Sequence, residues 1–284
     1  MKLGIIFANA GPFGEPEGLV QLARSAEEIG FESLWTVEHV VVPKGYESRY
    51  PYSPTGRMPG PEQAPIPDPF VWLAYAAAVT ERIRLATGVL ILPQRHPLYV
   101  AKEAATLDRL SRGRAMLGVG IGWLEEEFRA LGIPFAERTA RTEEAIAALR
   151  SLWSDGPSAF DGRHHRWAPL ESNPKPVQRP GIPIHVGGHV PAAARRAARI
   201  GDGFIPAQTQ RLPELLDALR AECARIGRDP AEIEISAGGA PSLDEVRRLR
   251  DQGVARYLVP PPGFAPDELR KGLERIGDEI LAKL

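Results

Sequence analysis

Short apolar runs alternate along the chain with longer segments whose apolar residues recur at helical spacing. Residues 19–29 place their leucines, alanines and isoleucine on one stripe, and Gly30 follows as a stop signal, which predicts a helix. The shorter runs lack that period and are typical of buried strands. The predicted strands are Leu3–Phe7, Ser33–Val37, Ile83–Leu92, Ala115–Val119, Pro183–Val186, Gly203–Ile205, Ile233–Ser236 and Tyr257–Val259. The predicted helices are Leu19–Ile29, Pro69–Val79, Leu98–Leu110, Thr139–Leu152, Ala192–Ile200, Pro213–Ile226, Leu243–Gln252 and Asp267–Leu281.

Strict alternation of strands and helices predicts a parallel sheet of the α/β class. An open, doubly wound sheet is the alternative to a closed one. The first strand is followed by Ala-Asn-Ala-Gly-Pro-Phe-Gly, which does not match the glycine pattern of a dinucleotide-binding turn. Eight units in 284 residues favour closure. We therefore expect one domain over residues 1–284, a (β/α)8 TIM barrel with a long loop insertion after strand two.

Two long stretches without helical or strand periodicity interrupt this rhythm, Val40–Asp68 and Ser154–Gly181. Loops of such length in a compact domain are usually functional or disordered. The first follows strand two at the catalytic face of a barrel, so we interpret it as a lid or a wall of the substrate pocket. Its Tyr46, Tyr50 and Tyr52 are unusual for a mobile surface loop, which is the alternative.

Composition restricts the partners of the chain. Apolar residues make up 43% and the net charge is −1, which is typical of a globular protein without a bulk attraction for nucleic acid or an anionic membrane. The apolar run Val71–Val79 is too short to span a bilayer, and the apolar stretch near the N-terminus is better explained as a strand than as a signal peptide. The single cysteine, Cys223, excludes an intramolecular disulfide and is expected to be inert. We expect a cytoplasmic protein.

Candidate catalytic residues are sought at the carboxyl ends of the strands, where barrels carry their active sites. Glu38 and His39, after strand two, form the only acid–imidazole pair at such a position. Histidine titrates near neutral pH and therefore suits proton transfer beside a redox cofactor. The alternative is a histidine that is merely satisfied by a backbone carbonyl in the barrel mouth.

Glycines follow two other strands at the same face. Gly120 and Gly122 free the backbone for close approach to a flat ligand, or make an ordinary strand-to-helix turn. Gly187 and Gly188 precede a helix that begins near Ala192, where free N–H groups can bind an anion. The alternative for this second pair is a tight loop.

Other side chains give weaker signals. Gly88 lies inside an otherwise branched strand and predicts a bulge. Trp123 either packs on a ring system or caps the barrel. The run Glu125–Glu127 is expected to be a solvated helix start, although one of the three could face a cofactor. His164 and His165 have no further ligand nearby in sequence, so no metal site is expected, and His185 is expected in the core.

These segments together resemble the luciferase-like monooxygenase superfamily and, within it, the F420-dependent oxidoreductases. The resemblance covers most of residues 1–210, and the combination is more specific than any single piece. The matching segments are Ala23–Phe31, Ser33–His39, Arg82–Val89, Arg95–Pro97, Ala101–Arg114, Leu117–Trp123, Pro183–Gly188, Arg195–Ala198 and Gly201–Phe204.

The resemblance implies a barrel that holds a flavin or deazaflavin ring at its mouth. A bulge in strand three, often with a non-proline cis peptide, presses on the ring in relatives and corresponds to Gly88 and Val89. The acid–histidine pair that contacts ring or substrate corresponds to Glu38 and His39. Many F420 enzymes have aspartate at the first of these two positions, so this chain departs from their pattern there.

The resemblance also implies cofactor contacts at the glycine turns and at Trp123. Gly120 and Gly122 correspond to one turn, and the second turn, at Gly187–Gly188, corresponds to the phosphate site. Some relatives carry a basic residue near the phosphate, where this chain has Ala207 and Gln208. Phosphate binding is therefore expected to depend on backbone N–H groups or on other side chains.

The expected function is F420-dependent hydride transfer to or from a small organic substrate, with His39 giving or taking the proton. One alternative is an FMN-dependent monooxygenase that receives reduced flavin from a separate reductase. Another is a non-catalytic flavin-binding protein on the same fold. Relatives are often dimers, so a homodimer is expected, and neither nucleic acid nor membrane is expected as a partner.

Overall fold

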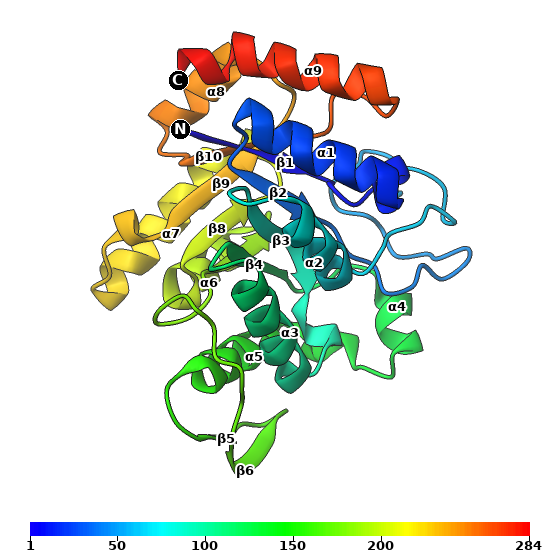
Figure 1. The fold of residues 1–284 in the computed structure, drawn as a ribbon. Helices are drawn as coiled ribbons and strands as arrows, with labels where there is room; N and C mark the ends of the chain where they lie inside the picture. Colours follow the sequence, from blue (N-terminus) through cyan, green and yellow to red (C-terminus); the bar gives the residue numbers. More distant parts are fainter.

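Eight parallel strands close into a barrel in the computed structural model, which describes residues 1–284. The strands follow one another around the barrel in chain order, with a helix between successive strands, so the predicted (β/α)8 TIM barrel is confirmed (Figure 1). The barrel strands are β1 (Lys2–Ile6), β2 (Ser33–Thr36), β3 (Arg84–Ile91), β4 (Ala115–Gly120), β7 (Ile184–Gly188), β8 (Gly203–Pro206), β9 (Glu234–Gly238) and β10 (Arg256–Val259).

The helices surround the barrel and begin or end within a few residues of the predicted positions. Most begin with proline in the first turn, where its missing N–H costs no intrahelical bond, and α1 ends at Gly30 in the left-handed conformation. The helices are α1 (Pro16–Ile29), α2 (Pro69–Val79), α3 (Pro97–Leu110), α4 (Glu125–Ala130), α5 (Arg138–Trp153), α6 (Pro191–Ile200), α7 (Leu212–Ile226), α8 (Leu243–Asp251) and α9 (Pro266–Glu279).

The main apolar core lies between the strands and this ring of helices. A second, smaller cluster fills the barrel itself with side chains from five different strands. Trp35 is its largest member, and Gly4 on the neighbouring strand leaves the space that the indole needs. The interior is therefore a packed core rather than a channel. The members of this cluster are Trp35, Ala86, Met116, Ile205 and Leu258.

A buried charge network closes the end of the barrel where the strands begin. Arg256 is fully buried and donates to the Glu32 carboxylate at 2.7 and 2.8 Å and to Ser236 Oγ at 2.9 Å. It also pairs with Glu234 and lies 5.4 Å from the centre of the Trp35 ring. Residues at this end of a barrel usually contribute to stability rather than to catalysis.

His185 on β7 lies in the core beside this network, as expected from the sequence. Burial lowers the pKa of His185 to about 4, although the Glu234 carboxylate opposes the shift. The unfolded chain, with an ordinary value of 6.5, therefore takes up the proton first as the pH falls. Stability is unaffected above pH 6.5 and should fall by about 3 kcal/mol between pH 6.5 and 4.

Urea unfolding of the wild type and of His185→Gln at several pH values checks this prediction. The variant should lose less stability than the wild type across that interval, by about the same 3 kcal/mol. Equal slopes for the two proteins would show that other groups cause the acid sensitivity.

The two long stretches differ in structure. Val40–Asp68 contains neither helix nor strand, as predicted. The interpretation of Ser154–Gly181 as a plain loop was wrong, because it contains an antiparallel hairpin, β5 (Ser158–Asp161) with β6 (Arg166–Leu170), which projects from the barrel (Figure 1). The Glu144 carboxylate on α5 accepts the N–H groups of the hairpin turn, a stabilising contact that has no local sequence signal.

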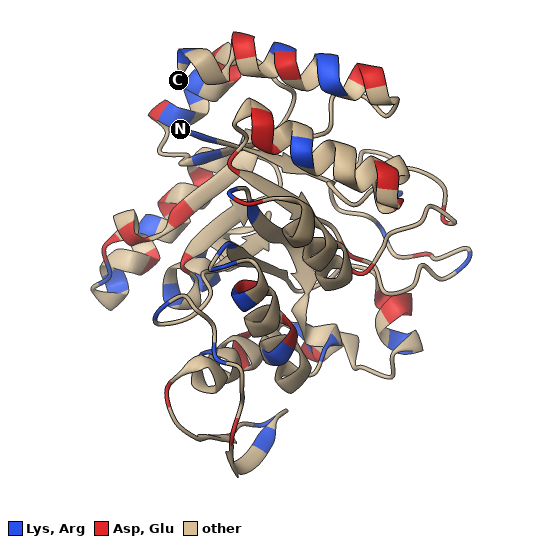
Figure 2. Cartoon of the chain, in the orientation of Figure 1, with Lys and Arg blue, Asp and Glu red and all other residues tan.

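Charged residues of both signs alternate along the outer helices, most visibly along α7 and α9 (Figure 2). This distribution agrees with the net charge of −1, although α6 carries only positive charges, from Arg195, Arg196 and Arg199. None of the helices combines the length and the apolar character that a bilayer crossing requires.

Candidate active site

His39 lies just beyond β2, at the end of the barrel where the strands finish. Its Nδ1 is 3.0 Å from Oε2 of Glu127, and its Nε2 has no hydrogen-bond partner. Only 8% of the side chain is exposed. A carboxylate can only accept, so Nδ1 carries the proton of the neutral ring and Nε2 keeps a free lone pair. No protein group therefore occupies the Nε2 atom of the ring.

The acidic run at the start of α4 is solvated only in part, because Glu125 is exposed while Glu126 is half-buried and Glu127 is buried. Glu127 is fully buried, and Oε1 accepts the N–H groups of Val40 at 2.6 Å and Val41 at 3.2 Å. Glu126 accepts those of Glu47 and Ser48 at 2.7 and 3.0 Å. The acids replace water as acceptors for backbone N–H groups of residues 40–68, which we call the lid.

Electrostatics agree with this anchoring role. Burial raises the pKa of Glu126, but the hydrogen bonds from Ser48 and from the Glu47 N–H outweigh it and lower the pKa to about 2. The carboxylate therefore stays charged over the whole range in which proteins usually fold. The sequence offered one usable signal for this arrangement, namely acidic residues directly after a strand end on the catalytic face.

Glu38 and His39 form hydrogen bonds with different partners. Its Oε2 accepts the Ile91 N–H at 2.5 Å, and its Oε1 accepts from Arg95 Nε at 2.8 Å. Arg95 in turn donates to Asp68 Oδ2 at 2.6 Å, at the end of the lid. Burial raises the pKa of the Glu38 carboxyl, and the Arg95 guanidinium opposes this effect. Both oxygens are thus occupied by protein donors.

Asn9, at the end of the first predicted strand, holds the lid from a third side. Its side-chain amide donates to the carbonyl oxygens of Val37 at 2.9 Å and Pro67 at 3.1 Å, and its Oδ1 accepts the Val37 N–H at 2.8 Å. Both ends of the lid are therefore fixed by buried or half-buried side chains of the barrel mouth.

Aromatic rings fill the underside of the lid. The Trp123 ring lies edge-on to three other rings. The distances between ring centres are 5.6 Å to His39, 5.5 Å to Tyr46 and 5.1 Å to Tyr50. Such edge-to-face pairs are favourable arrangements of aromatic rings. Trp123 thus joins the histidine to the lid, which supports the lid interpretation over a mobile surface loop.

The lid also reaches across the mouth. The ring of Tyr52 lies edge-on to those of Tyr50 and His189, with ring centres 5.1 and 4.9 Å apart. His189 comes directly after β7. Burial raises the pKa of Tyr52 to about 12, so the phenol stays neutral. The lid therefore spans from β2 to the turn that carries Gly187 and Gly188.

The predicted irregularity in strand three is present. The pairing of β3 with β4 shifts between Thr87 and Leu90, and the peptide bond between Gly88 and Val89 is cis. A side chain at position 88 would press on the Trp35 indole, with a Cβ only 3.1 Å from Cε3. Glycine at this position therefore avoids a tight contact with Trp35 inside the barrel.

Two of the predicted glycines make room for Val89. A Cβ at Gly120 would lie 2.5 Å from Val89 Cγ2, and a Cβ at Gly187 would lie 2.8 Å from its Cγ1. The Val89 side chain consequently fits between the ends of β4 and β7. The structure brings the bulge and these two strand ends together at the barrel mouth.

The other two glycines have packing reasons of their own. Gly122 adopts φ +79°, and a side chain there would meet Phe128 at 2.6 Å. A side chain at Gly188 would overlap the Cβ of Ala193 in α6. Contact of these glycines with a cofactor stays a prediction.

A cation missed by the sequence reasoning lies beside the second glycine turn. Arg211 follows β8 and donates to the His189 carbonyl oxygen at 3.4 Å, while its guanidinium also pairs with Glu214 at 2.8 Å. Ala207 and Gln208, at the place where the resemblance implies a basic residue, lie only a few positions earlier. Arg211 is therefore a candidate for contact with an anion at this turn.

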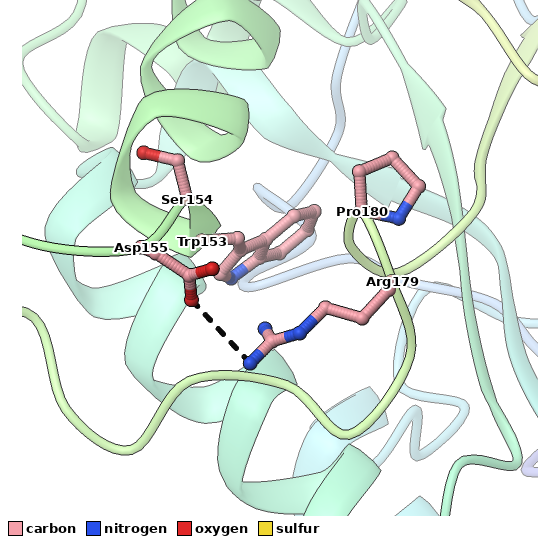
Figure 3. Close-up of a pocket in the computed structure, with 5 residues that line it drawn as sticks. All are labelled: Trp153, Ser154, Asp155, Arg179 and Pro180. Carbon is pink, nitrogen blue, oxygen red and sulfur yellow. Dashed lines mark ion pairs between the residues drawn. The ribbon is translucent and has the colours of Figure 1, made fainter.

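A hollow of about 490 Å³ is lined by none of these residues (Figure 3). It is lined by residues at the end of α5 and before β7, and the Arg179 side chain reaches across to Asp155 at 3.4 Å. Because this is the side where β7 begins, it is not the catalytic face of the barrel. Its lining residues are Trp153, Ser154, Asp155, Arg179 and Pro180.

Comparison with known proteins agrees with this geometry. The family model described as luciferase-like monooxygenase matches residues 1–279. The uncharacterised protein Rv0940c of Mycobacterium tuberculosis is 34% identical over 278 residues, which cover 93% of this chain and 95% of that protein. An F420-dependent glucose-6-phosphate dehydrogenase of Kineococcus radiotolerans is 32% identical over 253 residues, which cover 86% of this chain and 69% of the dehydrogenase.

Solved structures give the same result. The monooxygenase RslO1 from Streptomyces bottropensis superposes with a TM-score of 0.79 at 26% identity, and 99% of each chain is covered. The match of the family model over nearly the whole chain and the identity to these relatives exceed what a shared barrel architecture alone would give. The chain belongs to the luciferase-like monooxygenase family, and its F420-dependent relatives group it with the F420-dependent branch of that family.

Proposed function

We propose that the protein is an F420-dependent oxidoreductase that moves a hydride between the deazaflavin cofactor and a small organic substrate. The observation that carries this proposal is the His39 imidazole, which is held at Nδ1 by Glu127 and free at Nε2 beneath an aromatic lid. F420, when bound, supplies or takes up the hydride. His39 donates or accepts the accompanying proton at Nε2.

The residues of the mouth fit a flat ring with a phosphate-bearing tail. The bulge at Gly88–Val89 and the Trp123 indole offer apolar contacts beside His39. For the phosphate, we propose the N–H groups of the Gly187–Gly188 turn at the start of α6, with Arg211 as the cation. Gly120 and Gly122, at the end of β4, would allow the backbone to approach the flat ring closely.

Glu38 has a positioning role in this proposal. Its carboxylate joins the end of β3 to Arg95 and, through Arg95, to the lid. Proton transfer by Glu38 itself would require it to leave two hydrogen bonds, so His39 is the better candidate for the catalytic group.

A side-by-side titration with F420 and FMN tests the cofactor. F420 is expected to bind more tightly, because F420-dependent dehydrogenases are among the similar proteins and the motif set resembles theirs. Quenching of cofactor or tryptophan fluorescence gives both dissociation constants. Tighter binding of FMN, together with oxygen-dependent turnover, would contradict the proposal.

That second outcome would support the other candidate function, an FMN-dependent monooxygenase. The similarity to the monooxygenase RslO1 at 26% identity is the observation in its favour. Binding of either cofactor without any turnover would instead point to a non-catalytic flavin-binding protein.

The phosphate site can be tested at Gly188. In Gly188→Ala, the new methyl group overlaps Ala193 and displaces the turn from the start of α6. The intact cofactor should then bind about 10- to 100-fold more weakly, which is the loss of one or two charge-assisted hydrogen bonds. A riboflavin-like fragment without phosphate should lose much less.

The double variant Gly188→Ala/Ala193→Gly is the matched control, since it keeps the methyl group at position 188 and removes the atom that it strikes. The double variant keeps the strain of a side chain at φ +154°, so part of the lost cofactor binding is expected to return. If both ligands lost affinity equally in the single variant, the damage would be general and the phosphate assignment would fail.

We also propose a homodimer, as the family resemblance implies. Helix α2 is apolar on all sides, and Val71, 72% exposed, lies one turn from the exposed Tyr75. An apolar helix face that is left in solvent favours burial against another chain. A mass in solution of twice 31.0 kDa, measured by light scattering, would support this proposal.

A further inference from the structure

We propose that Glu127 is a positioning residue that sets the tautomer of His39 and ties it to closure of the lid. The inference rests on the proposed function, because positioning matters for turnover only if His39 transfers the proton. It concerns the chain's own residues and can be measured without any cofactor.

Glu127 has the contacts that this role requires. The carboxylate is fully buried, and its two oxygens accept three hydrogen bonds, from His39 Nδ1, the Val40 N–H and the Val41 N–H. No lysine or arginine pairs with it. A buried carboxylate without a cation is costly unless donors surround it, so these three bonds offset the cost of burying the Glu127 carboxylate.

The chemistry of the pair fixes the state of the ring. A carboxylate offers no proton, so the neutral imidazole must place its own proton on Nδ1. The lone pair on Nε2 is then available as a base, and the protonated ring is stabilised by the same carboxylate when it acts as an acid. A carboxamide at position 127 could donate to Nδ1 and would favour the opposite tautomer.

The same side chain links the ring to the lid. One oxygen holds the histidine, and the other holds the first two residues of the lid, which continue directly from His39. Opening the lid at this point removes donors from the carboxylate and loosens the ring. Lid closure and the orientation of Nε2 are therefore expected to change together.

Nitrogen-15 NMR of the histidine rings in the cofactor-free protein tests this directly. The chain has only six histidines, and the signals of His39 are identified by their loss in His39→Asn. The wild type should have the proton of neutral His39 on Nδ1. Glu127→Gln should shift the proton to Nε2 or give a mixture of both tautomers.

Glu126→Gln is the matched control, because Glu126 lies next in the chain and holds the lid without touching His39. It should leave the His39 tautomer unchanged. A wild-type ring with its proton on Nε2, or an unchanged ring in Glu127→Gln, would overturn the proposal. If Glu127→Gln did not fold, the wild-type tautomer and the Glu127→Asp variant would still decide it.

Turnover gives the second measurement. Glu127→Gln should lower kcat by about 10²-fold with little change in the KM for cofactor, and Glu127→Asp should restore part of the loss. A changed tautomer combined with normal turnover in His39→Ala would keep the positioning role and reject the proposed catalytic function. An unchanged tautomer with inactive His39→Ala would do the reverse.

Discussion

His39→Ala is expected to keep its fold and most of its affinity for the cofactor while its turnover falls about 10²- to 10⁴-fold, the usual contribution of a general acid or base. The side chain contributes little to the apolar core, and its one hydrogen bond is to Glu127 at 3.0 Å. Loss of the ring therefore removes a proton carrier at the mouth rather than support for the barrel. Stopped-flow or steady-state assays with a substrate found by screening would measure the loss.

Two further variants make this result interpretable. His39→Asn keeps a polar side chain near Glu127 but cannot carry a proton, so it should be nearly as slow as His39→Ala. His165→Ala, in the hairpin turn outside the barrel mouth, should turn over normally. Normal turnover in His39→Ala would move proton transfer to another group or to water, and unfolding would show that His39 is structural.

The barrel could be predicted from the sequence because its elements depend on local patterns. The apolar stripe in residues 19–29 predicts a helix, and the branched run before Gly88 predicts a strand. Each further unit repeats the same alternation of strand and helix. The hairpin at 158–170 could not be predicted in this way. Its turn is held by Glu144, a residue on a different element, and no short-range pattern records that contact.

In the site, too, local features could be predicted from the sequence and long-range contacts could not. His39, the bulge at Gly88 and the glycine turns were found because strand ends are the places where a barrel carries chemistry. The partner of His39 was not found, because Glu127 is 88 positions away and its acidic neighbours resemble an ordinary helix start. Adjacency in sequence suggested Glu38 as the partner, but that side chain binds Arg95. Long-range pairing decided each of these outcomes.

Arg256→Ala should be the most destabilising of the variants considered. The guanidinium is fully buried and satisfies the carboxylates of Glu32 and Glu234. Burial raises the pKa of Glu234, but Arg256 outweighs this effect and the pKa falls to about 2, so removal of the cation leaves the burial of that carboxyl uncompensated. Breaking one side of a buried ion pair typically costs about 3–5 kcal/mol. Urea unfolding monitored by circular dichroism measures this loss.

The triple variant Arg256→Met/Glu32→Gln/Glu234→Gln separates loss of packing from uncompensated charge. It restores apolar volume beside Trp35 and leaves no unpaired carboxylate, so it should recover much of the stability lost in Arg256→Ala. Arg270→Ala, which removes an exposed pair with Glu274, should change stability little. If the triple variant were as unstable as Arg256→Ala, the network would matter through the shape of the guanidinium and its bond to Ser236 rather than through its charge.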